Sequence, residues 1–376
     1  MILIIFPCVK KRDEEGENTV GFDNHSHHFW VMSGQQQTLC FFTVVMNRLH
    51  HLEQTLPENI AANNQGTTRF LVLDYNSTDG LQEYILKTFP KELMQGKLEY
   101  HRYAHAKYFS HSHSRNLAAT LTNAPYICNL DADNFTGPQF DEFLQEKFSQ
   151  HPRAVISALS NSFQVYGAFG RMATRREHFN EVGGYDEAFE GYGFEDYDLV
   201  SRLEQNGLEK VLIDKEAHLR TVSHDNNDRV AREWTHDQLA TLYRQQVSDN
   251  MQVLLYLFKD NSMHYGIVNE DFAAGVHYRY SLAGNRWQKG TWKESDENIL
   301  IRFEGFDAKF EKKGPYLTGN NHYMKAENDA EKLQEAVLFH TNMANCCRYL
   351  QNKERNKIRV NENGFGHGKT ESLLIH

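Results

Sequence analysis

Cysteine is scarce in this sequence of 376 residues, and the few cysteines present are poorly suited to pairing. The five stand at positions 8, 40, 128, 346 and 347, an odd number with two adjacent and no Cys-X-X-Cys spacing. Such a set supports neither a disulfide framework nor a zinc cluster of cysteines. A reducing compartment is therefore expected.

Long apolar runs are missing at the start of the sequence. The stretch MILIIFPCV is apolar but has nine residues, whereas a membrane-spanning helix needs about 20. It lacks a basic leader and a small-residue cleavage site, so a signal peptide is not expected, and residues 2–6 are predicted to form a buried strand. These features predict a cytoplasmic protein and leave peripheral contact with the inner face of the membrane open.

An excess of positive charge is absent as well. The 40 Lys and Arg residues are outnumbered by 50 Asp and Glu residues, which gives a formal net charge of −10 with histidine neutral. Nucleic-acid-binding proteins usually present a basic surface, so no nucleic-acid partner is expected. Apolar residues make up 40%, which is ordinary for a globular chain and provides an ample core.

What the sequence does have is a regular alternation of apolar runs and amphipathic segments from residue 39 onward. Runs at 39–46, 69–74, 97–103 and 124–130 are typical of strands buried on both faces of a sheet. Segments with helical spacing separate them. This alternation predicts an α/β fold of the Rossmann-like type, with a mostly parallel sheet and helices on both faces.

The character of the sequence changes after about residue 248. Apolar and polar side chains alternate over 298–310, with an interruption at Gly305, which predicts one half-exposed strand with a bulge. Residues 328–350 have the spacing of an amphipathic helix. The predicted organisation is an N-terminal extension at 1–38, an α/β domain at 39–248 and a smaller accessory α+β domain at 249–376.

Two aspartates one residue apart follow the fourth predicted strand. Residues i and i+2 of a strand share a face, so Asp131 and Asp133 should point the same way and repel each other. A divalent cation held together with phosphate oxygens would cancel this repulsion. Ligands of parallel sheets bind beyond the carboxyl ends of the strands, so the polar clusters at 47–48 and 74–76 are expected in the same crevice.

In this setting the chain resembles the GT-A class of glycosyltransferases, specifically the inverting family 2 enzymes, and its later part resembles the β-1,4-galactosyltransferase family. The resemblance covers residues 39–230 and rests on five ordered motifs: TVVMNRLHHLEQTLP, LVLDYNSTDG, SHSRNLA, NLDADN and GGYDEAFEGYGFEDYDLVSRL. It implies a GT-A enzyme that moves a hexose or N-acetylhexosamine from a UDP-sugar. The acceptor would be a hydroxyl of a glycan, glycolipid or polysaccharide.

The resemblance also implies roles for individual residues. Those expected to bind the nucleotide sugar are Asn47, Arg48, Asp74, Asn76, Arg115, Asp131 and Asp133. Those expected to bind the acceptor are Tyr192, Gly193, Phe194 and Glu195. The metal ligands would be Asp131, Asp133 and His224, with Mn²⁺ favoured over Mg²⁺ by the imidazole. Thr221 stands where the family has a methionine, which leaves the metal preference open, and the alternative for His224 is a surface position.

The general base is expected at Asp196. The preceding glycines allow close approach of a substrate, and the start of a helix favours the charged form of a carboxylate, which a base requires. By resemblance Asp196 takes the proton of the acceptor hydroxyl and Glu195 holds the acceptor. The alternative is that both residues simply cap the helix.

Three other functions stay open at this point. Retaining N-acetylgalactosaminyltransferases carry a loosely similar GGYD stretch, although the pair Glu195–Asp196 favours inversion. A nucleotide-sugar or glycan-binding module without catalysis is the second. The third is an adaptor whose residues 249–376 dock a membrane enzyme, a partner protein or a growing polysaccharide.

Overall fold

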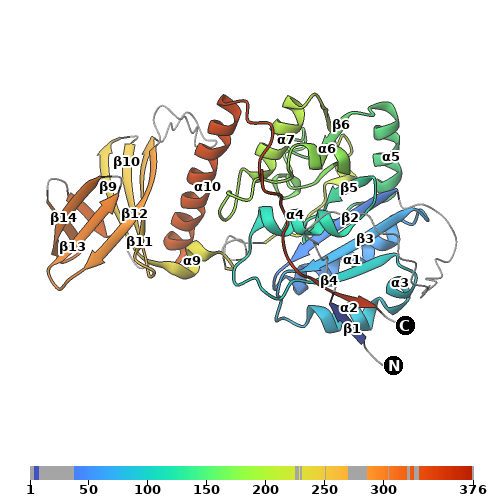
Figure 1. Ribbon diagram of the computed structural model, residues 1–376, viewed down its shortest axis with the longest axis horizontal. Helices are drawn as coiled ribbons and strands as arrows, with labels where there is room; N and C mark the ends of the chain where they lie inside the picture. The colour runs from blue at the N-terminus through green and yellow to red at the C-terminus, as the bar shows by residue number, and fades with distance from the viewer. Residues whose placement is uncertain are drawn as a thin grey trace, which may run out of the picture.

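The computed structural model describes residues 4–7, 38–224, 228, 231–249, 251–269, 286–303, 305–319, 322–325 and 330–374. Most of the predicted N-terminal extension, residues 8–37, lies outside this part of the chain. Figure 1 shows a large body of sheet and helices, a separate body of strands, and the long helix α10 standing between them. None of the described helices is both long enough and apolar enough to cross a membrane.

Within the described residues, the large body is built on one mixed sheet of nine strands in the order β1-β17-β4-β3-β2-β5-β7-β6-β8. Its centre is parallel, as predicted, and its strands are β2 (Leu39–Val45), β3 (Thr68–Asp74), β4 (Leu98–Arg102) and β5 (Tyr126–Asn129). Three further strands extend it: β6 (Ala154–Ser157), β7 (Met172–Arg175) and β8 (Glu209–Leu212). Of these, β7 runs antiparallel between β5 and β6.

Helices cover both faces of the sheet, which confirms the predicted layers. One face carries α1 (Leu49–Ala62), α2 (Leu81–Thr88), α3 (Pro90–Met94) and α5 (Phe140–Gln150). The other carries α4 (His111–Leu121), α6 (Arg176–Glu181) and α7 (Glu195–Gln205). Successive residues of β2, such as Phe41 and Phe42, belong to the cores on opposite faces of the sheet, which explains why the strand is apolar throughout.

The region after residue 238 takes the form of a closed antiparallel barrel followed by a helix. Its strands are β9 (Leu239–Ser248), β10 (Met251–Phe258), β11 (Ser262–Asn269), β12 (Arg286–Glu294), β13 (Asn298–Phe303), β14 (Phe306–Lys313), β15 (Tyr316–Thr318) and β16 (His322–Lys325). The single bulged strand predicted over 298–310 is wrong. It is the hairpin of β13 and β14, in which Phe303 pairs with Phe306 and Gly305 takes a φ of 79°. A two-residue turn shifts the apolar alternation by one position, as a bulge does, so the sequence pattern did not distinguish the two.

The chain returns from the barrel to the large body through α10 (Ala330–Glu354) and β17 (Glu371–Leu374). Met343 and Cys347 of α10 pack with Tyr256 and Phe258 of the barrel. Strand β17 then pairs with β4 and with β1 (Ile4–Pro7) at the edge of the main sheet. The C-terminal part of the sequence therefore completes the α/β body as well as forming the barrel.

Candidate active site

A cavity of about 830 Å³ opens beyond the carboxyl ends of β2 and β5. Its lining brings together residues from the loops after β2 and β5, from the starts of α4 and α7, and from α10. The sequence-predicted residues among them are Arg48, Arg115, Asp131, Asp133, Tyr192, Gly193, Phe194, Glu195, Asp196 and His224. The crevice expected from the sheet topology is therefore present, and most of the predicted site residues meet in it.

Arg115 is the positive charge nearest to Asp131. It lies in the second turn of α4, after Ser110, whose hydroxyl accepts a hydrogen bond from the backbone N–H of His113 at the start of that helix. Its Nη2 donates to Oδ1 of Asp131 at 2.9 Å. A Cβ atom at Gly170 would lie 2.3 Å from Oδ2 of Asp131, so only glycine allows this close approach.

The same guanidinium also holds the two carboxylates at the start of α7. Nη1 of Arg115 donates to Oε1 of Glu195 at 2.9 Å and to Oδ1 of Asp196 at 3.1 Å. The pKa of Asp196 is raised to about 8: burial is the largest cause, Arg115 opposes it, and Glu195 and Asp131 act in the same direction as burial. One cation thus faces three carboxylates, and Asp196 has the pKa of a group that can take up a proton near neutral pH.

Asp133 lies beside His224, a neighbour that only the family resemblance implied. Nε2 of His224 is 3.0 Å from Oδ2 of Asp133, whose side chain is largely buried. An antiparallel bridge between Asn134 and Thr221 brings the two segments together. Although burial opposes it, the hydrogen bond from His224 holds the pKa of Asp133 below its ordinary value.

This pair fits a divalent cation. In the structure Oδ2 and Nε2 share a hydrogen bond, and a divalent cation can replace its proton with little movement of either side chain, because two neighbouring ligands of an octahedral ion, each about 2.1 Å from it, are also about 3 Å apart. A carboxylate oxygen with an imidazole nitrogen is a donor set suited to Mn²⁺ or a related ion. Four carboxylates around the cavity, from Asp131, Asp133, Glu195 and Asp196, provide the negative charge that a cation would offset.

The loop that leads into α7 has an unusual backbone. Gly191, Gly193 and Phe194 have φ values of 69°, 107° and 67°, and the last is rare for a bulky residue. The ring of Phe194 stacks on Tyr349 of α10, with centroids 6.0 Å apart. The backbone N–H of Gly193 donates to Oε2 of Glu195 at 3.0 Å. Contacts from α7 and α10 thus hold the strained loop in place.

A model of a known protein family matches the segment that contains this loop. Residues 150–225 match the family model described as the N-terminal domain of galactosyltransferase, a segment that includes Glu195, Asp196 and His224. This segment of the chain is therefore similar to part of a galactosyltransferase. The mixed sheet of the chain, with the two aspartates directly after β5, has the GT-A arrangement expected from the sequence.

Solved structures that partly resemble this chain are sugar transferases, and their sequence identity to it is low. The mannosyltransferase PcManGT from Pyrobaculum calidifontis, in complex with GDP-Man and Mn²⁺, is 15% identical with a TM-score of 0.40; the match covers 50% of this chain and 59% of that one. TarS from S. aureus with UDP is 15% identical with a TM-score of 0.40, over 50% and 61%. A mutant of Drosophila β-1,4-galactosyltransferase 7 with manganese, UDP-Gal and xylobiose is 14% identical with a TM-score of 0.36, over 56% and 77%. A search of curated proteins finds no match.

Three residues predicted to contact the nucleotide lie outside the lining of the cavity. Asp74 is 1% exposed and accepts hydrogen bonds from the Tyr100 hydroxyl at 2.5 Å and the Ser77 backbone at 2.6 Å. Asn47 accepts a bond from the backbone of Thr78, and Asn76 donates to the carbonyl of Ala106. These side chains use their hydrogen-bonding capacity to shape the loops after β2 and β3.

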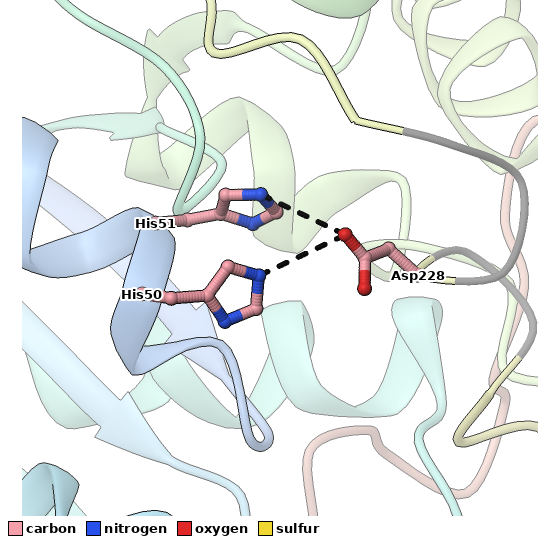
Figure 2. Close-up of side chains that lie close together, drawn as sticks. All are labelled: His50, His51 and Asp228. Carbon is pink, nitrogen blue, oxygen red and sulfur yellow. Dashed lines mark ion pairs between the residues drawn. The ribbon is translucent and has the colours of Figure 1, made fainter.

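Sequence reasoning missed a cluster of His50, His51 and Asp228 beside the cavity (Figure 2). Nε2 of His50 and Nε2 of His51 lie 3.7 and 3.9 Å from Oδ2 of Asp228. Two imidazoles and a carboxylate are a metal-binding combination, but Nη1 of Arg48 lies 3.3 Å from Nδ1 of His51 and can only donate to it. A neutral His51 then carries its proton on Nε2, which leaves no lone pair there for a metal. As arranged, the cluster is a network of polar side chains around Asp228 rather than a metal site.

Sequence reasoning also missed Glu233, a buried acid in front of α9 (Trp234–Gln238). It is 1% exposed, and neither carboxylate oxygen has a hydrogen-bond partner among the described residues. Its Oε1 lies 3.9 Å from Nε2 of His111, whose Nδ1 is 3.9 Å from Oε1 of Glu195. Burial, followed by the charge of Glu195, raises the pKa of Glu233 to about 8, and burial lowers the pKa of His111 to about 3. A protonated acid thus faces a neutral imidazole at pH 7.

We predict that Glu233→Gln makes the fold less sensitive to pH. Because the folded pKa of about 8 lies above the ordinary value of 4.5, the stabilising contribution of the protonated form is full below pH 4.5 and is lost as the pH rises toward 8. Gln is neutral at every pH, so the melting temperature of the variant should rise relative to that of the wild type as the pH increases from 4.5 to 8. Glu216→Gln, at an exposed acid, is the control. Parallel melting curves at all pH values would contradict the assignment.

Proposed function

We propose that this protein is a metal-dependent inverting glycosyltransferase. It moves a hexose or N-acetylhexosamine from a UDP-sugar to a hydroxyl of a glycan or glycoconjugate. The proposal depends on one observation: the Asp133–His224 pair and the carboxylate of Asp196 share one cavity, in which Arg115 links Asp131 to Glu195 and Asp196. A place for a diphosphate-bound cation and a place for a base are both needed for direct displacement of a nucleoside diphosphate.

Asp133 and His224 are the residues that would hold Mn²⁺ or Mg²⁺. When bound there, the cation would neutralise charge that develops on the departing diphosphate. Asp131 keeps its ion pair with Arg115, so we assign it to the donor sugar or nucleotide rather than to the metal. Arg48, which lines the cavity beside His51, supplies a second guanidinium near the phosphates.

Asp196 is the proposed base, and inversion is the proposed stereochemistry. In one step the acceptor oxygen forms a bond to the anomeric carbon, the bond from that carbon to the diphosphate breaks, and the hydroxyl proton passes to Asp196. A raised pKa makes the ionised carboxylate a stronger base than an ordinary aspartate, and the guanidinium of Arg115 favours that ionised form. Glu195 is held by Arg115 and by the backbone of Gly193, which favours a role in positioning the acceptor.

A screen of nucleotide sugars tests the proposal. The purified chain is incubated with UDP-, GDP- and ADP-sugars and simple glycoside acceptors, with Mn²⁺, with Mg²⁺ or with EDTA. We expect UDP release that requires both the cation and the acceptor, and a product whose anomeric configuration by NMR is opposite to that of the donor. Retained configuration would point to a retaining hexosaminyltransferase instead. Binding of a UDP-sugar without any turnover would point to a binding module.

We predict that His224→Ala lowers activity mainly by weakening the metal site. The variant removes one of the two proposed ligands but leaves Asp133 and Asp196 unchanged, so excess Mn²⁺ should restore part of the rate. A metal titration of initial rates measures this. The control is His151→Ala, since His151 lies on the surface at the end of α5. If His224→Ala follows the wild-type titration, His224 has no role in metal binding.

A further inference from the structure

Helix α10 contributes to the cavity although it lies outside the segment matched by the galactosyltransferase family model. Leu338 and Asn342 are its two lining residues. The helix follows the barrel in sequence and stands between the barrel and the α/β body (Figure 1). Deleting residues 249–376 would therefore remove part of the cavity wall together with β17. Loss of activity in such a variant would not show whether this region docks a partner, because the site itself would be incomplete.

Buried hydrogen bonds attach α10 to the loop that carries the proposed base. Asn345, 3% exposed, pairs with both backbone groups of Glu190: its Nδ2 donates to the carbonyl at 3.1 Å, and its Oδ1 accepts from the N–H at 3.3 Å. Arg348 donates to Asp186 at 2.8 and 3.0 Å. Asn352 connects Asp186 with Asp198 of α7. The position of α10 relative to the loop at 190–196 is thus well determined.

Asn342 is the polar residue that α10 presents to the cavity. Its Nδ2 donates to the carbonyl of Leu338 at 2.7 Å, which fixes the orientation of the amide. Its Oδ1 lies so close to Gly193 that a Cβ atom there would be 2.3 Å away. The amide therefore sits directly beside the backbone between Tyr192 and Phe194. An amide offers both a donor and an acceptor without charge, which matches a sugar hydroxyl.

We propose that α10 forms one wall of the acceptor site and that Asn342 helps select the acceptor by hydrogen-bonding a hydroxyl of an uncharged sugar. The inference rests on the proposed function and deepens it. Asn342 adjoins the loop of Glu195 and Asp196 rather than the Asp133–His224 pair, which assigns it to the acceptor and not to the diphosphate. Arg115 offsets only one of the carboxylates that it holds, so the remaining negative charge would repel a uronate or another anionic sugar.

The test uses the full chain and a set of p-nitrophenyl glycosides of glucose, xylose, N-acetylglucosamine and glucuronate. Asn342→Ala should raise the KM for the best uncharged glycoside about tenfold, which is the usual effect of one lost hydrogen bond. The KM for the UDP-sugar should stay within twofold. The matched control is Gln351→Ala, at an exposed position on the same helix. The glucuronide should be inert with both proteins.

Saturation-transfer NMR of the same glycosides, in the presence of UDP and Mn²⁺, adds a readout that needs no turnover. Binding that is lost in Asn342→Ala without any sugar transfer would support the acceptor wall and overturn the proposed enzyme activity. Turnover with an unchanged glycoside KM in Asn342→Ala would overturn the acceptor wall and leave the enzyme activity standing. Failure of every uncharged glycoside to bind the wild type, or preference for the glucuronide, would also overturn the inference.

Discussion

Asp196→Asn is expected to lower turnover by roughly 10²–10⁴, the usual effect of removing a positioned general base. Asn keeps the size of the side chain but cannot take up the acceptor proton. Arg115 retains Glu195 and Asp131 as partners, so the guanidinium should hold its place in the variant. UDP affinity should therefore stay within a few-fold of wild type, because Asp133 and His224 are unchanged.

Rate and binding are measured separately to check this. Steady-state kcat with a saturating donor and acceptor reports the chemistry, and calorimetry with UDP and Mn²⁺ reports binding. Asp214→Asn, at an exposed acid paired with Lys147, is the matched control and should behave as wild type in both. Glu195 is engaged with Arg115 and with the N–H of Gly193, so it should not replace the lost base. A variant that keeps more than about a tenth of wild-type kcat would exclude Asp196 as the base.

The central part of the site was predictable because its signals are local in the sequence. Asp131 and Asp133 follow an apolar strand directly, and Glu195–Asp196 stand at a helix start after glycines. Parallel strands bring their carboxyl ends to one edge of the sheet, which placed the two aspartates in the crevice, whereas the family resemblance assigned Glu195 and Asp196 to the same site. His224 needed the family resemblance, because the bridge that brings its segment to Asp133 is a long-range contact.

The residues that were missed come from segments whose position depends on the rest of the fold. Glu233 precedes a short helix, and Asn342 belongs to a helix that reaches the cavity only after the chain has completed the barrel. Nothing in their sequence neighbourhood indicates which elements they will face. Asp74 shows the opposite problem. It stands at a strand end like Asp131, but its hydrogen bonds to Tyr100 and Ser77 direct it away from the cavity lining.

The barrel illustrates a further limit of prediction from sequence patterns. The period of two in residues 298–310 correctly indicated strands, and Ile299, Ile301 and Phe310 do fill an interior. However, alternation is the same for an open sheet, a bulged strand or a closed barrel, because in each of them half of the side chains face a core. The closure depends on β9 pairing with β16 over a long stretch of sequence. Local patterns contain no information on that pairing.

Asp133→Ala is expected to abolish the metal dependence of UDP binding. The proposed cation site has two protein ligands, and removing the carboxylate leaves only the imidazole of His224. It also removes the charge that draws a cation into this part of the cavity. Losing one ligand of an ion that bridges protein and diphosphate should weaken UDP binding by about a hundredfold or more.

Titration calorimetry of UDP with Mn²⁺ and with EDTA measures both parts of this effect. Wild type should bind UDP much more tightly with Mn²⁺, whereas Asp133→Ala should give the same weak affinity in both solutions. Asp131→Asn is the informative comparison, because Asp131 is paired with Arg115 and we do not assign it to the metal. That variant should keep the Mn²⁺ dependence even if its affinity falls. Equal UDP affinity of the wild type in Mn²⁺ and EDTA would show that Asp133 and His224 are a simple ion pair. The expected difference in UDP affinity between Asp133→Ala and Asp131→Asn would then have no physical basis.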